Sequence, residues 1–422
     1  MVYNMLVWAA QPLLRRKLAR RAVAEPGYGV AVPERFGHYT QAAETGSELV
    51  WVHAVSLGES RAAGILVQAL REAVPGVRIL LTHGTATGRD EGFRILRAGD
   101  VQVWQPWDTP AAVQRFLWHF RPRLGLLMET EVWPNLVLQS RAAGVPVALV
   151  NARMSEKSLQ SALRWASLMR PTYGALSAVW AQTEDDAERL QALSATVQAV
   201  KGNLKFDAQP DAQQCAQAQA WRARLQRPVL MLASSREGEE AQWLEALRAW
   251  TGALISVQWL IVPRHPQRWD EVQDLLVHAG LTVSRRSSWS ADGPPGAELQ
   301  ADVWLGDSLG EMALYYSLAD VALLGGSFAP LGGQNLIEAA ACACPVFMGP
   351  HTFNFAEVAE QAEAEGAARR VQDMAQAVEQ ACTAVADTAA MQVWRTQALA
   401  FTQAHKGAAR RVAGLVKELL AL

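Results

Sequence analysis

Residues 325–350, GGSFAPLGGQNLIEAAACACPVFMGP, decide the fold class of this chain. They follow the apolar run Val321–Leu324 and lead into a helix-like stretch at 335–340. A strand, a glycine-rich loop and a helix start, in this order, are typical of an α/β sheet that binds a ligand at the carboxyl ends of its strands. We therefore interpret the segment as an anion-binding centre.

Four glycines of this segment, Gly325, Gly326, Gly332 and Gly333, let the backbone turn tightly and come close to a ligand. Free N–H groups at the start of the next helix attract phosphate. Glu338 lies one turn into that helix, where a carboxylate can accept hydrogen bonds from ribose hydroxyls. The glycine spacing fits neither the dinucleotide fingerprint nor the P-loop. A glycine-rich turn without a ligand is the alternative interpretation.

The composition is that of a globular protein with more than one core. Half of the 422 residues are apolar, which is enough for two domains or more. The net charge of −2 and the pI of about 6.5 give no basic field, so we expect no nucleic-acid partner. The four cysteines lack metal-site spacing and are interpreted as reduced packing residues in a cytosolic environment.

The first residues depart from this pattern. Residues 1–14, MVYNMLVWAAQPLL, are apolar, and five Arg and Lys residues follow within 15–21. Fourteen helical residues extend about 21 Å, short of a hydrocarbon core of about 30 Å. An apolar segment followed by cations favours a monotopic anchor on anionic lipid. The alternative is a buried first helix with a solvated basic end.

The rest of the chain alternates short apolar runs with helical stretches, which predicts parallel sheets covered on both faces. We predict an anchor and basic linker at 1–32 and two Rossmann-like domains at 33–207 and 208–422, with the last helix left free to pack back on the first domain. The predicted strands are 49–55, 77–82, 123–128, 145–150 and 178–181, then 228–233, 259–263, 281–283, 303–305, 321–324 and 345–348.

Polar residues cluster directly after these strands, where an open α/β sheet binds ligands. Carboxylates dominate the first domain, at Glu59, Glu129 and Glu131, whereas glycines and cations dominate the second. This division predicts a transferase that activates a hydroxyl on one domain and holds an anionic donor on the other. A carboxylate that accepts the hydroxyl proton contributes about 10²–10⁴-fold, and Lys205 and Arg264 can stabilise a phosphate leaving group.

Each candidate also has a structural interpretation. Glu59 can cap the helix that follows it, and Glu129 can hold Arg153 or the next loop in place. Glu131 precedes a Trp-Pro turn, which favours a structural role, and His265 between two prolines is consistent with an exposed loop residue. The residues alone leave these alternatives open.

Seven motifs in one order resemble the 3-deoxy-D-manno-octulosonic acid (Kdo) transferase family. Single motifs of this length are weak evidence, but the ordered set covers nearly the whole chain. They are ERFG at 34–37, WVHAVSLGE at 51–59, METEVWPN at 128–135, NARMS at 151–155, GNLKF at 202–206, VPRHP at 262–266, and GGSF with GGQNLIE at 325–338.

The resemblance implies a GT-B fold, two tandem Rossmann-like domains facing each other across a cleft, with an N-terminal membrane anchor. It implies an inverting glycosyltransferase on the cytoplasmic face of the bacterial inner membrane that moves Kdo from CMP-Kdo to a lipid A precursor, lipid IVA, in lipopolysaccharide biosynthesis. The first domain then binds the acceptor and the second CMP-Kdo, without metal or cofactor, and anionic lipids of that membrane are partners. A UDP-sugar transferase, a nucleotide-sugar epimerase and a non-catalytic nucleotide-sugar-binding protein docked on the membrane are the alternatives.

The resemblance also implies roles for individual residues. Glu59 is the catalytic base, and Glu129 lies with it in the acceptor pocket. Residues 235–239, SREGE, replace a common Thr-His-Glu-Gly-Glu, which makes Arg236 a donor contact in place of histidine. The implied donor-binding residues are Lys205, Ser235, Arg236, Arg264, His265, Gly325, Gly326, Ser327, Gly333, Asn335 and Glu338, and the acceptor-binding residues are Ser56, Arg89, Glu131 and Arg153.

Overall fold

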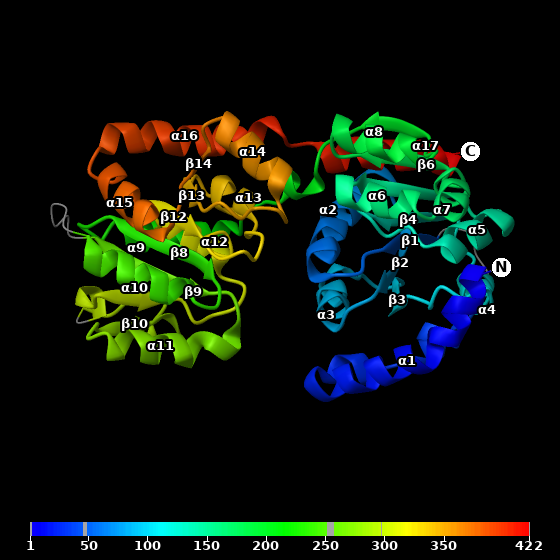
Figure 1. Ribbon diagram of the computed structural model, residues 1–422, viewed down its shortest axis with the longest axis horizontal. Coiled ribbons are helices and arrows are strands. Elements are labelled where there is room, and N and C mark those ends of the chain that lie inside the picture. The colour runs from blue at the N-terminus through cyan, green and yellow to red at the C-terminus, as the bar shows by residue number, and fades with distance from the viewer. Residues whose placement is uncertain (1, 45–48, 251–256, 297, 422) are drawn as a thin grey trace. The chain divides into compact units, whose positions relative to one another are not determined.

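A computed structural model describes residues 2–44, 49–250, 257–296 and 298–421. The chain divides into two compact units. The first combines the described parts of Met1–Asp207 and Gly407–Leu422, and the second is Ala208–Lys406. In Figure 1 the first unit therefore contains the blue to green elements together with the red end of the chain.

The first unit contains a seven-stranded parallel sheet in the order β3-β2-β1-β4-β5-β6-β7. Its strands are β1 Leu49–His53, β2 Arg78–His83, β3 Val101–Trp104, β4 Leu124–Met128, β5 Val147–Ala152, β6 Ala178–Ala181 and β7 Val197–Val200. Its helices are α1 Val2–Ala24, α2 Leu57–Ala73, α3 Ala86–Ile95, α4 Pro110–Phe120, α5 Pro134–Ala142, α6 Glu156–Leu163, α7 Ala166–Tyr173, α8 Glu184–Ala192 and α17 Ala408–Ala421, with short 3-10 turns η1 Pro26–Gly29, η2 Val32–Phe36 and η3 Leu204–Asp207.

Alternation along β1 explains why both faces of this sheet are covered. Successive strand side chains point to opposite faces. Leu49 and Trp51 pack with residues of α4, α5 and α8, whereas Val50 and Val52 pack with α2 and α17. All five residues of β1 are buried, which is the pattern of a central parallel strand.

The last helix, α17, packs against α2 in the first unit. Val412 and Val416 are buried in the same apolar cluster as Leu66 of α2. The carboxylate of Asp207 accepts hydrogen bonds from the N–H groups of Gly407 and Ala409 at the start of this helix. The arrangement that the sequence left open, in which the last helix packs on the first domain, is the one observed.

The second unit repeats the parallel architecture with the strand order β10-β11-β9-β8-β12-β13-β14. Its strands are β8 Val229–Ser235, β9 Gln258–Pro263, β10 Val283–Arg285, β11 Val303–Leu305, β12 Val321–Leu324, β13 Val346–Met348 and β14 Ala368–Arg370. Its helices are α9 Ala212–Arg222, α10 Glu239–Ala249, α11 Trp269–His278, α12 Met312–Leu318, α13 Leu336–Ala341, α14 Ala356–Ala364, α15 Met374–Ala384 and α16 Thr388–Ala404, with short 3-10 turns η4 Pro266–Arg268, η5 Arg286–Ser288 and η6 Glu298–Gln300. Trp243 of α10 and Trp394 of α16 anchor the cluster on one face, and all four cysteines are free thiols.

All eleven strands predicted from apolar runs are present, with boundaries that differ by at most a few residues. The strands that the sequence missed, β3, β7 and β14, lie at sheet edges. They read VQVW, VQAV and ARR, so polar residues interrupt the apolar pattern on which the prediction relied.

Helix α1 lies on the outside of the first unit (Figure 1). None of its described residues is buried, so the alternative of a buried first helix is wrong. Met5, Trp8 and Leu13 are 66%, 73% and 67% exposed. Within the described residues, no helix combines the length and hydropathy needed to span a bilayer.

Candidate active site

The strand order of the first sheet reverses between β1 and β4. The chain runs from β1 to β2 and β3 on one side, and then returns to β4 on the other side of β1. Loops that diverge from two such neighbours leave a crevice at the carboxyl ends of the strands, which is where open α/β sheets bind ligands. Glu59 follows β1, and Glu129 and Glu131 follow β4, so the fold brings the three predicted carboxylates to this point.

Glu59 is held by hydrogen bonds at the start of α2. Its carboxylate accepts from the N–H of Val55 and from the hydroxyl of Ser56, both at 2.9 Å, while the Ser56 oxygen accepts from the N–H of Glu59 at 3.3 Å. Ser56 and Glu59 thus cap the start of α2 together, with the carboxylate on the N–H of Val55 next to the N-cap, so the structural role considered from the sequence is present. Burial raises the pKa of Glu59, and the charges of Glu131 and Glu129 raise it further. A general base gains from a pKa moved toward neutrality.

Glu131 is oriented by two rings that the sequence did not assign to the site. The indole N–H of Trp133 donates to it at 2.8 Å, and Nε2 of the buried His53 lies 3.8 Å from the same oxygen. Nδ1 of His53 is 2.8 Å from the hydroxyl of Thr82. Burial works to raise the pKa of Glu131, but the contacts with His53 and Trp133 outweigh it, and the pKa is lowered. The pKa of Glu131 is therefore lowered, whereas the pKa of Glu59 is raised.

Glu129 is buried between two cations. Arg153 Nε lies 2.9 Å from one carboxylate oxygen, and Lys205 Nζ lies 2.9 Å from the other. Its backbone has φ of 53°, a left-handed conformation that L-residues rarely adopt outside turns and functional sites. The contact with Arg153 is the structural role considered for Glu129. Lys205, expected to contact the donor, belongs to the first unit and joins this cluster.

Arg89 contacts a residue of the short turn η2 and a residue of β3. Its guanidinium pairs with the buried carboxylate of Glu34 at 3.0 Å and lies 4.9 Å from the centre of the Trp104 ring. The Glu34 carboxylate also accepts from the N–H of Trp104 at 2.8 Å. Arg89 thus ties the ERFG motif to the sheet, and its predicted acceptor contact stays a prediction.

The second sheet reverses its order between β8 and β12. The loop 236–238 follows β8 and the glycine-rich loop follows β12, so the two predicted donor loops are neighbours. At Gly325 the backbones come so close that an added Cβ would lie 2.4 Å from the carbonyl oxygen of Ser234. Gly326 and Gly333 have φ of 71° and 75°, which glycine adopts without strain. The glycines are therefore required by the backbone path.

The glycine-rich loop holds a carboxylate of its own chain. Glu239, at the start of α10, is buried and accepts hydrogen bonds from the N–H groups of Gly326 at 2.7 Å, Phe328 at 3.1 Å and Ala329 at 3.2 Å. It also accepts from the N–H of Arg236 at 2.9 Å. We expected the N–H groups of this loop to be free for a phosphate; these three are not, because an internal carboxylate occupies them.

Two serines assigned to the donor have internal partners. The hydroxyl of Ser327 donates to Leu324 O and accepts from the N–H of Gly349 at 2.8 Å. Ser235 donates to Glu240, whose carboxylate also forms a two-pronged pair with Arg268 at 2.8 and 2.9 Å. Both serines are fully buried, so their observed role is to fix the ends of β8 and β12.

Cations gather beside these loops at the ends of β8 and β9. Burial lowers the pKa of His265, and the positive charges of Arg236 and Arg264 lower it further. This places the three predicted side chains within electrostatic reach of one another. A neutral imidazole near guanidinium groups can donate or accept a hydrogen bond, while the guanidinium groups attract an anion.

Asn335 and Glu338 lie together at the start of α13. The Asn335 side chain accepts from the N–H of Ile337 at 3.1 Å, and its amide nitrogen donates to Glu338 at 3.2 Å. Asn335 is the N-cap, so it has a structural role, and its contact orients the Glu338 carboxylate. The ribose contact proposed for Glu338 stays a prediction.

Sequence reasoning missed Glu239 and His53 as parts of these two sites. Glu239 lies in the first turn of a helix, where the helix dipole favours a carboxylate, so its position does not by itself indicate a role in a site. His53 lies in a fully buried strand and looks like a core residue. The available signal was positional: both residues lie at or just after the end of a central strand.

The matching family and two similar proteins carry the same name. The family described as 3-Deoxy-D-manno-octulosonic-acid transferase (kdotransferase) matches residues 31–208. A 3-deoxy-D-manno-octulosonic acid transferase of Bordetella pertussis is 47% identical over 99% of this chain and 99% of its own length. The enzyme of the same name from Haemophilus influenzae is 32% identical over 84% of this chain and 83% of its own.

A solved structure shows the fold independently of sequence. A glycosyltransferase from Rickettsia africae superposes with a TM-score of 0.58 at 14% identity, over 89% of this chain and 99% of its own. At that identity the likeness concerns the fold alone, which is the GT-B arrangement of two Rossmann-like domains. Together with the identity to the Bordetella and Haemophilus enzymes, it establishes that this chain is a glycosyltransferase and belongs to the 3-deoxy-D-manno-octulosonic acid transferase family.

Proposed function

We propose that this enzyme transfers Kdo from CMP-Kdo to a lipid A precursor, lipid IVA, with inversion, in lipopolysaccharide biosynthesis. The observation that carries the proposal is the placement of Glu59. Its carboxylate is fixed by Val55 and Ser56 at the reversal point of the first sheet, and its pKa is raised. A fixed carboxylate with a raised pKa suits the removal of a proton from a sugar hydroxyl. The names and identities of the relatives support the choice of Kdo as the sugar.

The proposed reaction is a single displacement. Glu59 accepts the proton of a glucosamine hydroxyl as that oxygen attacks the anomeric carbon of Kdo. The bond from this carbon to the CMP phosphate oxygen breaks at the same time, and CMP leaves with the electron pair. Attack opposite to the leaving group inverts the anomeric centre. The first unit therefore binds the acceptor, and Glu129, Glu131, Ser56, Arg89 and Arg153 shape its site.

The second unit is assigned to the donor. Arg236 and Arg264 supply positive charge for the CMP phosphate and the Kdo carboxylate, which favours the leaving group, and His265 supplies a hydrogen bond. Glu338, oriented by Asn335, accepts hydrogen bonds from the ribose. Glu239 holds the glycine-rich loop in shape but does not touch the donor in this scheme. We assign no metal and no cofactor to the reaction.

Helix α1 is proposed to lie on the cytoplasmic face of the inner membrane. Its exposed apolar residues and the cations that follow them, Arg15, Arg16, Lys17, Arg20 and Arg21, suit a surface contact with anionic lipid. This contact would bring the enzyme to an acceptor that resides in the bilayer.

Mass spectrometry of the product tests the proposal. Purified enzyme is incubated with CMP-Kdo and a tetra-acylated lipid A precursor, and the acceptor is expected to gain the mass of one or more Kdo residues. UDP-sugars serve as competing donors, and Glu59→Gln serves as the inactive control. CMP release without a mass gain on the acceptor would rule out the transfer, and a gain from a UDP-sugar alone would reassign the donor.

A further inference from the structure

An apolar groove lies between α1 and the first turn of α4. It has a volume of about 580 Å³, which is in the range of sites that hold extended small molecules. Its apolar lining comes from Met5 and Trp8 on one side and from Phe36, Trp107 and Pro110 on the other. Trp8 is 73% exposed although it lines this groove, so part of the indole is left for a ligand.

The walls of the groove are held in place by specific contacts. The Tyr3 hydroxyl of α1 donates to Asp108 at 2.7 Å. The Arg15 guanidinium lies 4.0 Å from the centre of the Phe36 ring, and this ring packs edge-on against Trp107 at 4.4 Å. A groove with fixed walls requires less ordering when a ligand binds than a surface that must first assemble.

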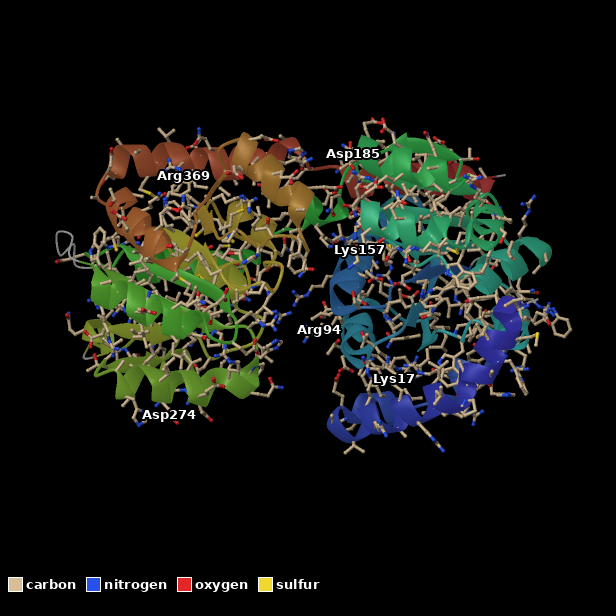
Figure 2. The ribbon with its side chains drawn as sticks, viewed as in Figure 1. Lys17, Arg94, Lys157, Asp185, Asp274 and Arg369 are labelled. Carbon is tan, nitrogen blue, oxygen red and sulfur yellow. The ribbon has the colours of Figure 1, made fainter. Side chains whose placement is uncertain are left out.

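Positive charge borders the groove. Arg115 lines it and donates to the carbonyl oxygen of Phe36 at 3.0 Å, and the Arg15 guanidinium lies over the ring of Phe36. Further along α1, Arg16, Lys17, Arg20 and Arg21 border a second hollow of about 550 Å³, and Figure 2 labels Lys17 there. An apolar groove with cations at its border is complementary to a molecule that carries both an alkyl chain and phosphate.

Hydrogen bonds connect the groove to the proposed base. Arg35, next to Phe36 of the groove, donates from Nη2 to Gly84 O at 3.2 Å. The N–H of Gly84 donates to Val55 O at 3.3 Å, and the N–H of Val55 donates to Glu59 at 2.9 Å. A series of hydrogen bonds within the first unit therefore links the groove to Glu59.

We propose that this groove binds a fatty acyl chain of the lipid acceptor and so helps to select acylated acceptors. The inference rests on the proposed function, because it takes the acceptor to be a phosphorylated and acylated glucosamine lipid. The bordering cations favour such a molecule over an uncharged alkyl ligand. The position of the groove in the unit that carries Glu59 favours the acceptor over a lipid that serves only to hold the protein at the bilayer.

A matched pair of variants on α4 tests the groove. Ala111 lines the groove, whereas Gln114, another exposed residue of the same helix, does not. Ala111→Trp fills the groove, whereas Gln114→Trp adds the same indole to the surface outside it. KM is measured for a tetra-acylated acceptor and for the same disaccharide bisphosphate with its chains removed, at one detergent concentration. Transfer to the chain-free acceptor also shows that each variant is folded.

We expect Ala111→Trp to raise KM for the acylated acceptor about tenfold, and to change KM for the chain-free acceptor and for CMP-Kdo less than twofold. Gln114→Trp should change all three less than twofold. Equal changes for both acceptors, or no change for either, would overturn the proposal. Sedimentation with anionic phospholipid vesicles gives a second way to overturn it. If Ala111→Trp no longer sediments with the vesicles, Gln114→Trp still does, and acceptor KM is unchanged, the groove holds a lipid of the bilayer and not the acceptor.

A binding measurement separates this inference from the proposed function. Electron paramagnetic resonance of a nitroxide-labelled stearate measures how far the protein immobilises an alkyl chain, and it does not require the transfer reaction. Immobilisation by the wild type and by Gln114→Trp, but not by Ala111→Trp, supports the groove. If that pattern occurs while the wild type transfers no Kdo, the proposed function fails and the alkyl site stands. If the wild type transfers Kdo but no variant changes chain binding or acceptor KM, the groove proposal fails alone.

Discussion

A carboxylate oxygen of Glu239 lies 2.7 Å from the amide nitrogen of Gly326, and this contact joins the loop after β8 to the glycine-rich loop after β12. Three more backbone N–H groups, those of Arg236, Phe328 and Ala329, donate to the same carboxylate. A single buried side chain thus takes the place that a phosphate occupies in many glycine-rich loops. The loop is ordered by the protein itself, so it does not depend on a ligand to become ordered.

Glu239→Ala should therefore destabilise the second unit and weaken CMP binding. Each buried donor left without a partner costs about 1–3 kcal/mol, and water will replace part of the loss, so we expect the free energy of unfolding to fall by roughly 2–5 kcal/mol. Urea denaturation measures the stability and calorimetry the CMP affinity. Glu245→Ala, on the exposed side of the same helix, is the control. Wild-type stability together with wild-type CMP affinity would contradict this role.

Glu59→Gln should abolish transfer while CMP binding is kept. The amide retains an oxygen for the N–H of Val55, so the cap of α2 is largely preserved, but it cannot accept a proton from the acceptor hydroxyl. We expect kcat to fall about 10²–10⁴-fold. Glu184→Gln, which removes a carboxylate from the exposed first turn of α8, should leave kcat unchanged. Turnover within a few-fold of the wild type would exclude Glu59 as the base.

The pH dependence of kcat/KM should report the environment of Glu59. The charge of Glu131 favours the protonated form of Glu59 and so contributes to its raised pKa. Glu131→Gln removes this charge, which lowers the pKa of Glu59 and keeps the base ionised at lower pH. The acid limb of the profile should then move to lower pH, whereas Glu156→Gln, on an exposed helix start, should not move it. A shift to higher pH would show that another group controls this limb.

Glu338→Ala should weaken the binding of CMP. Hydrogen bonds to a charged group are worth about 1.5–3 kcal/mol, so we expect the dissociation constant to rise about ten- to a hundredfold. The cap that Asn335 provides for α13 remains, which keeps the helix start in place. Glu360→Ala, an exposed position of α14, is the control for removal of a carboxylate from this unit. An unchanged affinity would remove Glu338 from the ribose site.

The sequence predicted most of the sheet architecture because buried parallel strands are continuous apolar runs. The same logic placed Glu59, Glu129 and Glu131 at one sheet edge, since polar residues after such strands meet there. It could not give the strand order, and therefore it did not show that β1 neighbours β4 and β8 neighbours β12. The Glu239 contact depends on that adjacency, because its partner Gly326 is 87 residues away.

Local patterns also failed where a residue has two roles. Ser327 follows two glycines, which favours a ligand contact, yet its hydroxyl is fully engaged with the backbone of its own loop. Lys205 follows the last strand of the first sheet, and only the three-dimensional arrangement shows that its ammonium contacts Glu129. Spacing identifies the loops, but the contacts within them depend on neighbours that are remote in sequence.

The return of α17 to the first unit affects the order in which the protein can fold during synthesis. The apolar face of α2 is covered by Val412 and Val416, which are made more than 300 residues after α2. The second unit, Ala208–Lys406, is complete before them. Although most of the first unit is translated before the second, it must wait with an uncovered face until α17 has been made, and a premature stop before α17 would leave that apolar surface open to aggregation.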